Sequence, residues 1–204
     1  MLWSHRLLAF VLILSTLMCA VTAQSAALIV ALGDSNTAGY GVSAENAFPA
    51  RLQAMLRRGG YDVQVANAGI PGDTLRGMLA RLDRFVPQGT RVVIVQGGYN
   101  DVMVGTSAAA LVASIDGILG HLAARRIKAV LCGFYNPGWD AIGRIIARKY
   151  GAIFVAGSAC YDGRYRGWDG LHMTAAGHQV VAARLLPTLE ALLQPSQHHA
   201  TADH

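Results

Sequence analysis

Residues 31–41 read ALGDSNTAGYG. They overlap an apolar run over residues 28–32, which stops at Gly33 and is followed by an acid, a hydroxyl and an amide. A short apolar run bounded by glycine is typical of a buried β-strand. The polar side chains have two interpretations: a tight turn that ends the strand, or a turn that presents the Ser35 hydroxyl for chemistry. Most serines after strands are turn or helix-cap residues, so the choice depends on the rest of the chain.

The same pattern of a short apolar run recurs along the chain. Four further runs predict strands, and apolar residues at helical spacing predict helices between and after them. The expected strands are 27–32, 62–66, 91–96, 127–132 and 152–156, and the expected helices are 47–58, 74–86, 107–125, 138–150 and 174–194. Continuous apolar strands separated by helices favour a parallel sheet covered on both faces. The predicted fold class is therefore α/β, a three-layer α/β/α sandwich around a five-stranded parallel sheet.

The composition is that of one globular domain. Of 204 residues, 53% are apolar and 14% are charged, which is the reverse of a disordered chain. Lysine and arginine outnumber aspartate and glutamate by 17 to 12, a formal net charge of +5. Because these bases are scattered rather than gathered in a patch with aromatic residues, we expect no nucleic-acid partner. A mildly basic surface attracts anionic molecules only weakly.

The N-terminal segment has the layout of a secretory signal peptide. Arg6 precedes an apolar stretch over residues 7–17, and Val21 and Ala23 occupy the −3 and −1 positions of a possible cut. The apolar stretch is too short to span a bilayer comfortably, although a retained anchor is the alternative. We therefore expect an exported protein without stable membrane insertion after cleavage. The expected division is 1–23 signal peptide, 24–195 folded domain and 196–204 disordered tail.

Two cysteines follow the signal segment, Cys132 and Cys160. Two cysteines do not make a disulfide scaffold, and their spacing matches no metal motif, so no metal is expected. Cys132 lies near the end of one predicted strand and Cys160 shortly after the next, so adjacent strands would bring them near each other. In an oxidising compartment they could pair. The alternative is one buried and one exposed thiol, and the sequence leaves both open.

Polar clusters stand on the carboxyl side of four predicted strands. They are residues 33–36 (GDSN), 67–74 (NAGIPGDT), 97–101 (GGYND) and, after the fifth strand and a loop, 168–174 (WDGLHMT). In doubly wound sheets the functional groups gather beyond the carboxyl ends of the strands. The four clusters should therefore meet at one edge of the sheet.

Acyl transfer from a serine needs a nucleophile, a base, an acid that orients the base, and donors for the oxyanion. Ser35 can supply the hydroxyl, His172 the base, and Asp169, three residues earlier, the acid. The backbone N–H groups of Ser35 and Gly72 and the side-chain amide of Asn100 can supply the donors. The four clusters therefore predict a serine hydrolase site.

Other polar residues have simpler explanations. His121 is expected on a helix surface, and His178 lies in the last helix with no acid at the required spacing, so His172 is the preferred base. Asp34 is expected to hydrogen-bond backbone N–H groups, and Asp101 to be structural. No G-x-G-x-x-G follows the first strand and no Walker motif is present, so neither a dinucleotide nor a phosphate-loop cofactor is expected.

Taken together, the four clusters resemble those of the SGNH hydrolases, the GDSL-type esterase and lipase superfamily. GDSN at 33–36 stands in place of GDSL, Gly72 matches the second-block glycine, residues 98–101 match G-x-N-D, and residues 169–172 match D-x-x-H. Their order and separation match too, over roughly residues 27–194. The resemblance implies the flavodoxin-like SGNH hydrolase fold, with the catalytic and oxyanion roles assigned above.

Within that superfamily the chain resembles the bacterial arylesterase, acyl-CoA thioesterase and lysophospholipase branch, through GDSNTAGYG, FPARLQAML, NAGIPGDT and ARL. This resemblance implies a periplasmic or secreted enzyme, monomeric or nearly so, without metal or cofactor. Its expected substrates are carboxylic esters or thioesters that are small or carry a single acyl chain. Rival readings are a carbohydrate O-acetyl esterase of the same superfamily and a non-catalytic binding module with this fold.

The chain departs from that branch at two points. Tyr99 stands where the branch often has glycine, and no proline follows His172. We expect Tyr99 to line or crowd the acyl pocket, and Trp168, on a loop at the same edge, is a second substrate-binding candidate. Aromatic packing alone would also explain Trp168.

Overall fold

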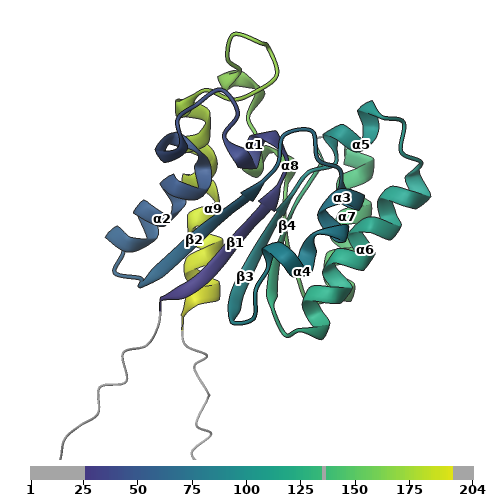
Figure 1. Cartoon of the computed structure of the whole chain (residues 1–204), viewed down its shortest axis with the longest axis horizontal. Helices are drawn as coiled ribbons and strands as arrows, with labels where there is room; N and C mark the ends of the chain where they lie inside the picture. Colours follow the sequence, from purple (N-terminus) through teal and green to yellow (C-terminus); the bar gives the residue numbers. More distant parts are fainter. Residues whose placement is uncertain (1–25, 135–136, 195–204) are drawn as a thin grey trace, which may run out of the picture.

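The computed structural model of the chain describes residues 26–134 and 137–194. Within these residues, one sheet has five strands in the order β2-β1-β3-β4-β5, and every neighbouring pair is parallel (Figure 1). The strands are β1 (Ala27–Gly33), β2 (Val63–Gly69), β3 (Thr90–Gln96), β4 (Lys128–Cys132) and β5 (Ile153–Val155). Each predicted strand is present, and the predicted α/β/α sandwich is confirmed.

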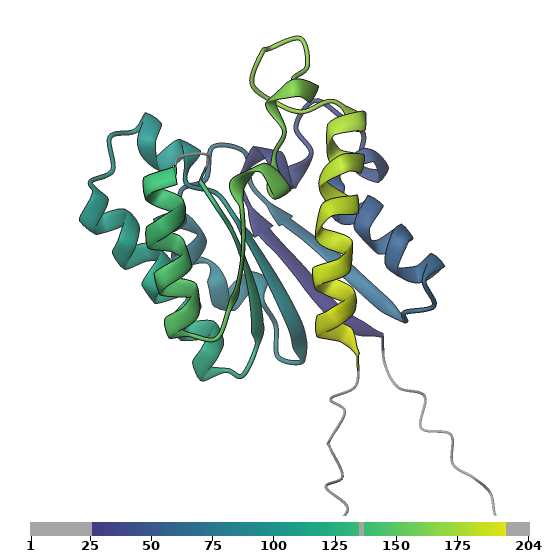
Figure 2. The same ribbon diagram turned by 180° about the vertical axis from the view of Figure 1, so that it is seen from behind.

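Helices cover both faces of the sheet, as the two opposite views show (Figures 1 and 2). The helices on one face are α2 (Phe48–Arg58) and α9 (Ala175–Leu193), and those on the other are α3 (Leu75–Ala80), α4 (Leu82–Phe85), α6 (Ala108–Ala124) and α7 (Pro137–Lys149). Alternate residues of a strand point to opposite faces, so a strand between two helical layers must be apolar throughout. In β1, Ile29 and Ala31 pack against α2 and α9, while Val30 and Leu32 pack against α3 and α6.

Several short elements at the loop edge were not predicted. They are α1 (Ser35–Ala38), α5 (Tyr99–Met103), α8 (Gly157–Cys160) and the 3₁₀ helices η1 (Ala44–Asn46) and η2 (Gly163–Tyr165). Each is shorter than two helical turns, too short to show an apolar period. The prediction of one helix over 74–86 is wrong, because the helix divides at Arg81, whose φ is −104°. The apolar spacing runs on through the break, since Leu75, Met78 and Leu82 face the same core.

Cys132 and Cys160 form a disulfide with a Cα–Cα distance of 5.9 Å. Cys132 ends β4, and Cys160 lies in α8, directly after the neighbouring strand β5. Both residues are buried in the core between the sheet and α9. The sequence left open a disulfide or two separate thiols, and the structure contains the disulfide.

The predicted signal peptide (1–23) and the predicted tail (196–204) lie outside the described residues. Among residues 26–134 and 137–194, no helix has both the length and the apolarity needed to cross a membrane.

Candidate active site

The polar clusters that follow β1, β2 and β3 meet the 168–174 loop at the carboxyl edge of the sheet. A cavity of about 230 Å³ lies between them and is lined by Ser35, Gly72, Tyr99, Asn100 and His172, among others. The structure thus brings together residues up to 137 positions apart in the sequence. Their convergence follows from the parallel sheet, because every strand ends at the same edge.

Ser35 is the first residue of α1, and Asp34 caps this helix. The Asp34 carboxylate accepts a hydrogen bond of 2.9 Å from the Asn36 N–H. The first N–H groups of a helix have no partner within it, so the Ser35 N–H is left for another acceptor. The helix is held against β3 by the Thr37 hydroxyl, which donates to Gln96 Oε1 over 2.7 Å. Ser35 is 9% exposed and lines the cavity.

The imidazole of His172 lies between Ser35 and Asp169. Its Nε2 is 2.9 Å from Ser35 Oγ, and its Nδ1 is 2.5 Å from Asp169 Oδ2. A carboxylate only accepts, so Nδ1–H donates to Asp169, and Nε2 is left to accept from the serine hydroxyl. The Tyr40 ring lies beside the imidazole, with the two ring centroids 4.5 Å apart.

The Asp169 carboxylate is held by its own loop. Oδ1 accepts hydrogen bonds of 2.9 Å from both the Leu171 and the His172 N–H. The hydrogen bond from the His172 ring, together with these N–H groups, lowers the pKa of Asp169 to about 2. The carboxylate is therefore ionised at neutral pH and can stabilise a positive charge on the ring.

Gly72 occupies the third position of a β-turn over residues 70–73. The Asp73 N–H donates to the Ile70 carbonyl over 3.1 Å, Pro71 holds the second position, and Gly72 has a φ of 80°. Proline followed by a residue of positive φ is the signature of a type II turn, which strongly favours glycine at that point. No atom lies within 4 Å of where a Gly72 side chain would begin, so backbone conformation rather than crowding requires glycine here.

Asn100 enters the cavity from α5. Gly98 precedes this helix with a φ of 102°, and a side chain there would meet the Phe134 ring at 2.4 Å. The Asn100 amide donates to the Asp73 carbonyl over 2.8 Å. An amide nitrogen carries two hydrogens, so this bond uses only one of them.

The two substrate-binding candidates lie in different places. Tyr99 is 42% exposed and lines the Ser35 cavity. Trp168 is 89% exposed and lines a neighbouring cavity of about 370 Å³, on the other side of Tyr40 and His172. A third cavity, of about 380 Å³, adjoins Tyr99 and is lined by Tyr161, Arg166 and Leu171 as well.

The residues that the sequence analysis explained by structural roles lie where those roles place them. His178 is fully buried, its Nδ1 accepts from the Phe48 N–H, and burial lowers the pKa of His178 to about 4. His121 pairs with Asp83 on the surface. The Asp101 carboxylate accepts from the Leu75 N–H, and burial raises the pKa of Asp101. Among residues 26–134 and 137–194, no three metal-binding side chains are grouped as a metal site requires.

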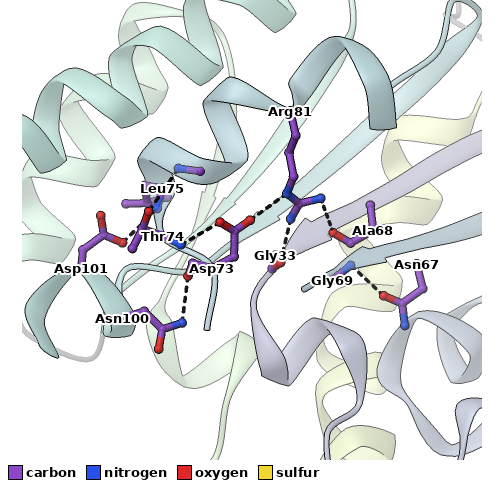
Figure 3. Close-up of polar contacts among 11 residues, drawn as sticks. Gly33, Asn67, Ala68, Gly69, Asp73, Thr74, Leu75, Arg81, Asn100 and Asp101 are labelled. Carbon is purple, nitrogen blue, oxygen red and sulfur yellow. Dashed lines mark hydrogen bonds and ion pairs between the residues drawn. The ribbon is translucent and has the colours of Figure 1, made fainter. Parts of the chain in front are cut away.

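Three residues of this region were not predicted from the sequence: Tyr40, Asp73 and Arg81. Arg81 donates to the carboxylate of Asp73 and to the backbone carbonyls of Ala68 and Gly33 (Figure 3). Asp73 and Arg81 both fall within stretches that carry the family resemblance, NAGIPGDT and ARL, which was the available signal.

Sequence comparisons identify relatives of the chain. The sequence profile described as the GDSL-like Lipase/Acylhydrolase family matches residues 31–180. Esterase TesA of Pseudomonas aeruginosa is 30% identical over 191 residues, which is 85% of this chain and 93% of the relative. Arylesterase of Vibrio mimicus is 37% identical over 101 residues, covering 49% of each chain. Thioesterase 1/protease 1/lysophospholipase L1 of Escherichia coli K12 is 31% identical over 138 residues, 63% of this chain and 65% of the relative.

Solved structures of esterases have a similar fold to this chain. A crystal structure of TesA superposes with a TM-score of 0.72 at 26% identity, covering 81% of this chain and 99% of the other. AlinE4, an SGNH-hydrolase family esterase, has a TM-score of 0.66 at 30% identity, with 84% and 99% covered. The resemblance expected from the four polar clusters is thereby confirmed: the chain belongs to the GDSL-like lipase/acylhydrolase family and is an SGNH-type hydrolase.

Proposed function

We propose that this protein is a serine esterase that hydrolyses carboxylic esters or thioesters through an acyl-enzyme. The observation that carries the proposal is the unbroken contact from Ser35 Oγ through the His172 ring to Asp169, with distances of 2.9 and 2.5 Å. A hydroxyl, a base and an orienting acid in this arrangement are the requirements for nucleophilic catalysis by serine.

In the proposed acylation step, Ser35 Oγ attacks the carbonyl carbon while its proton passes to His172 Nε2. Asp169 holds the ring in the tautomer that can accept this proton and stabilises the imidazolium that forms. The tetrahedral intermediate then collapses, the bond to the leaving alcohol or thiol breaks, and His172 returns the proton to it. Water repeats the sequence in deacylation and frees the carboxylic acid and Ser35.

The negative charge on the tetrahedral oxygen requires donors that are already in place. We assign this role to the N–H of Ser35, the N–H of Gly72 and the side-chain amide of Asn100. All three residues line the same cavity of about 230 Å³. The first N–H of α1 lacks a partner in its helix, and the Asn100 amide keeps one hydrogen beyond its bond to Asp73.

The proposed substrates are small or carry a single acyl chain. Tyr99 lines both the Ser35 cavity and the neighbouring cavity that Leu171 also lines, so it is placed to contact the acyl group. Trp168 is proposed to contact the part of a substrate that extends past Tyr40 and His172. The names of the relatives, esterase, arylesterase and thioesterase 1/lysophospholipase L1, support this range of leaving groups.

The test of the catalytic assignment is Ser35→Ala assayed on p-nitrophenyl acetate and butyrate. We expect kcat to fall by about 10⁴-fold or more, because the nucleophile is removed while the donors remain. A fluorophosphonate probe should label the wild-type protein at Ser35 and leave the variant unlabelled. Near-full activity in the variant, or a wild-type protein that neither turns over esters nor reacts with the probe, would overturn the proposal; the second result would favour a binding module.

The substrate class is tested with one panel: aryl esters of increasing chain length, acyl-CoA, lysophospholipid and acetylated xylan. We expect turnover of the aryl and single-chain substrates. A preference for acetylated xylan would identify a carbohydrate O-acetyl esterase instead.

We also propose that the protein is exported to the periplasm or secreted, with cleavage after Ala23, and is a monomer. The arrangement of Arg6, the apolar stretch 7–17 and the small residues before the cut supports export. The buried disulfide supports an oxidising compartment. Intact-mass measurement of the protein from a periplasmic extract, and light scattering of the purified protein, test cleavage and oligomeric state.

A further inference from the structure

The guanidinium of Arg81 joins the ends of two neighbouring strands to the turn that carries Asp73 (Figure 3). Its Nη2 donates to the Gly33 carbonyl over 3.0 Å, its Nη1 to the Ala68 carbonyl over 2.8 Å, and its Nε to Asp73 Oδ2 over 2.7 Å. These acceptors lie at the end of β1, at the end of β2 and in the turn that follows β2. We propose that Arg81 is a positioning residue that sets the relative placement of the nucleophile and the oxyanion donors. The inference rests on the proposed function.

Two of the three contacts of Arg81 lead directly to groups assigned to the reaction. Gly33 stands two residues before Ser35, and Asp73 follows Gly72. The Asp73 carbonyl in turn accepts the hydrogen bond of 2.8 Å from the Asn100 amide. One side chain therefore orients the two donors contributed by Gly72 and Asn100 relative to the end of β1, from which Ser35 projects.

A second contact strengthens the link to α5. Asp101 Oδ2 accepts from the Leu75 N–H over 2.9 Å, and Asp101 is fully buried. With the bond from Asn100 to Asp73, α5 is tied at two points to residues 73–75. A shift of the Asp73 turn would therefore be passed on to Asn100.

The chemistry of the Arg81 contact is specific to arginine. Its side chain is 11% exposed and that of Asp73 12%, and the guanidinium lies 4.9 Å from the Phe85 ring. A planar guanidinium presents five N–H groups at fixed angles, whereas a lysine ammonium is a point charge with three. Arg81→Lys keeps the charge beside Asp73 but cannot reach all three acceptors in the same geometry.

Arg125 provides a matched control. Its side chain is 14% exposed, it pairs with Asp83 over 3.3 Å, and it donates to the Val86 carbonyl over 2.6 Å. Like Arg81 it joins a carboxylate and a backbone carbonyl, although it bonds one carbonyl fewer and Asp83 is 75% exposed. It connects the end of α6 to α4 and the residue that follows it, before β3 begins. If Arg81 only stabilised the fold, substitution of either arginine would affect activity alike.

The experiment compares Arg81→Lys with Arg125→Lys by kcat, KM and thermal midpoint on p-nitrophenyl butyrate. We expect Arg81→Lys to lower kcat by about 10- to 100-fold with KM changed less than about threefold, because donors displaced by even 1 Å lose much of their effect on the transition state. Arg125→Lys should keep kcat within about twofold at a comparable loss of thermal midpoint. Equal kcat losses in the two variants would overturn the inference.

A double-mutant cycle tests whether Arg81 acts through Asn100. In the Asn100→Ala background, the kcat loss caused by Arg81→Lys should be at least about threefold smaller than in the wild type, since one of the donors it positions is gone. Losses that simply multiply would overturn this route. If Arg81→Lys does not fold, the same comparison is made on the carboxylate partners of the two arginines. Asp73→Asn is then the test variant and Asp83→Asn the control.

The outcomes separate this inference from the proposed function. A wild-type protein without esterase activity, or an active Ser35→Ala variant, contradicts the proposed function itself. An active wild type, an inactive Ser35→Ala and an unaffected kcat in both Arg81→Lys and Asp73→Asn contradict only the positioning role.

Discussion

The polar stretch after β1 both makes a turn and presents a hydroxyl. Asp34 and Asn36 form the turn, and Ser35 supplies the hydroxyl. Asp34 makes the turn, because its carboxylate accepts the Asn36 N–H and begins α1. Ser35 is therefore not needed as a cap, and its hydroxyl meets His172 instead. The price of this arrangement is a carboxylate buried beside the site, since Asp34 is only 1% exposed.

Burial of Asp34 predicts a pH-dependent stability. Burial raises the pKa of Asp34 from 3.8 to about 6. The folded protein thus holds this proton more tightly than the unfolded chain, so the contribution of Asp34 to stability is complete below the unfolded pKa and is lost as the pH rises through 6. Asparagine cannot ionise and still caps a helix.

We therefore expect the unfolding free energy of Asp34→Asn to increase relative to that of the wild type as the pH rises from about 4 to about 8. The expected increase is up to about 3 kcal/mol. Urea unfolding of both proteins at the two pH values measures this difference. A wild-type-to-variant difference that stays constant with pH would contradict the raised pKa.

Asn100 is expected to contribute an oxyanion hydrogen bond. Asn100→Ala removes one donor, so kcat should fall by about 10²–10³-fold with a smaller change in KM. Asn67→Ala is the control, because Asn67 also bonds backbone groups, the Ala38 carbonyl and the Gly69 N–H, but does not line the Ser35 cavity. Equal kcat values for the two variants in steady-state assays would remove Asn100 from the mechanism.

At the scale of elements, short segments rather than long helices carry the site. The long helices α2, α6, α7 and α9 cover the sheet, whereas Ser35 and Asn100 lie on α1 and α5, each of fewer than six residues. Short helices cannot hold themselves in place. They are held by side chains that cross between elements, such as Thr37 to Gln96 and Asp101 to Leu75.

The turn over residues 70–73 is expected to be sensitive to the loss of its glycine. Gly72→Ala must place alanine at a φ near 80°, which costs about 1 kcal/mol of stability and shifts the N–H assigned to the oxyanion. We expect kcat to fall by about tenfold or more, measured with a p-nitrophenyl ester.

Gly60→Ala is the control for this strain. Gly60 has a φ of 86° and open space around it, and it lies in the turn between α2 and β2, at the other end of β2 from Gly72. Both variants should lose similar stability in urea unfolding, but Gly60→Ala should keep its kcat. A kcat loss of the same size in Gly60→Ala would mean that strain alone accounts for the effect.

At the scale of the whole molecule, the disulfide connects the sheet to the segment that leads to His172. Cys132 ends β4, and Cys160 stands twelve residues before His172 in the chain. The loop that follows Cys160 folds back on itself. The Gly167 N–H donates to the His172 carbonyl, and the backbones of Arg166 and Met173 form an isolated antiparallel β-bridge. The bond therefore fixes the start of the segment that carries His172 and Asp169, the proposed base and acid.

The disulfide closes a loop with a sequence separation of 28 residues. Chain entropy predicts that such a loop stabilises the fold by about 3–4 kcal/mol. We expect a thiol reductant to lower the unfolding free energy of the wild type by this amount in urea titrations. The paired variant Cys132→Ala/Cys160→Ala should show no response to reductant, and an unresponsive wild type would contradict the prediction.

The family and the architecture were predictable because they depend on local patterns. Apolar runs such as 28–32 report strands buried on both faces, and the clusters at 33–36, 67–74, 97–101 and 168–174 stand where parallel strands end. The prediction of one helix over 74–86 failed at Arg81. Apolar periodicity shows which side chains face the core, but not where the backbone departs from the helix.

The sequence by itself determined which residue types stand after each strand, and therefore the class of chemistry. Only the tertiary structure decided that Cys132 bonds Cys160, that Trp168 borders a different cavity from Tyr99, and that Arg81 reaches carbonyls 13 and 48 residues away. The physical reason is that these contacts depend on strand order and on the paths of loops across the sheet edge. Neither leaves a period or a spacing in the chain that sequence analysis can detect.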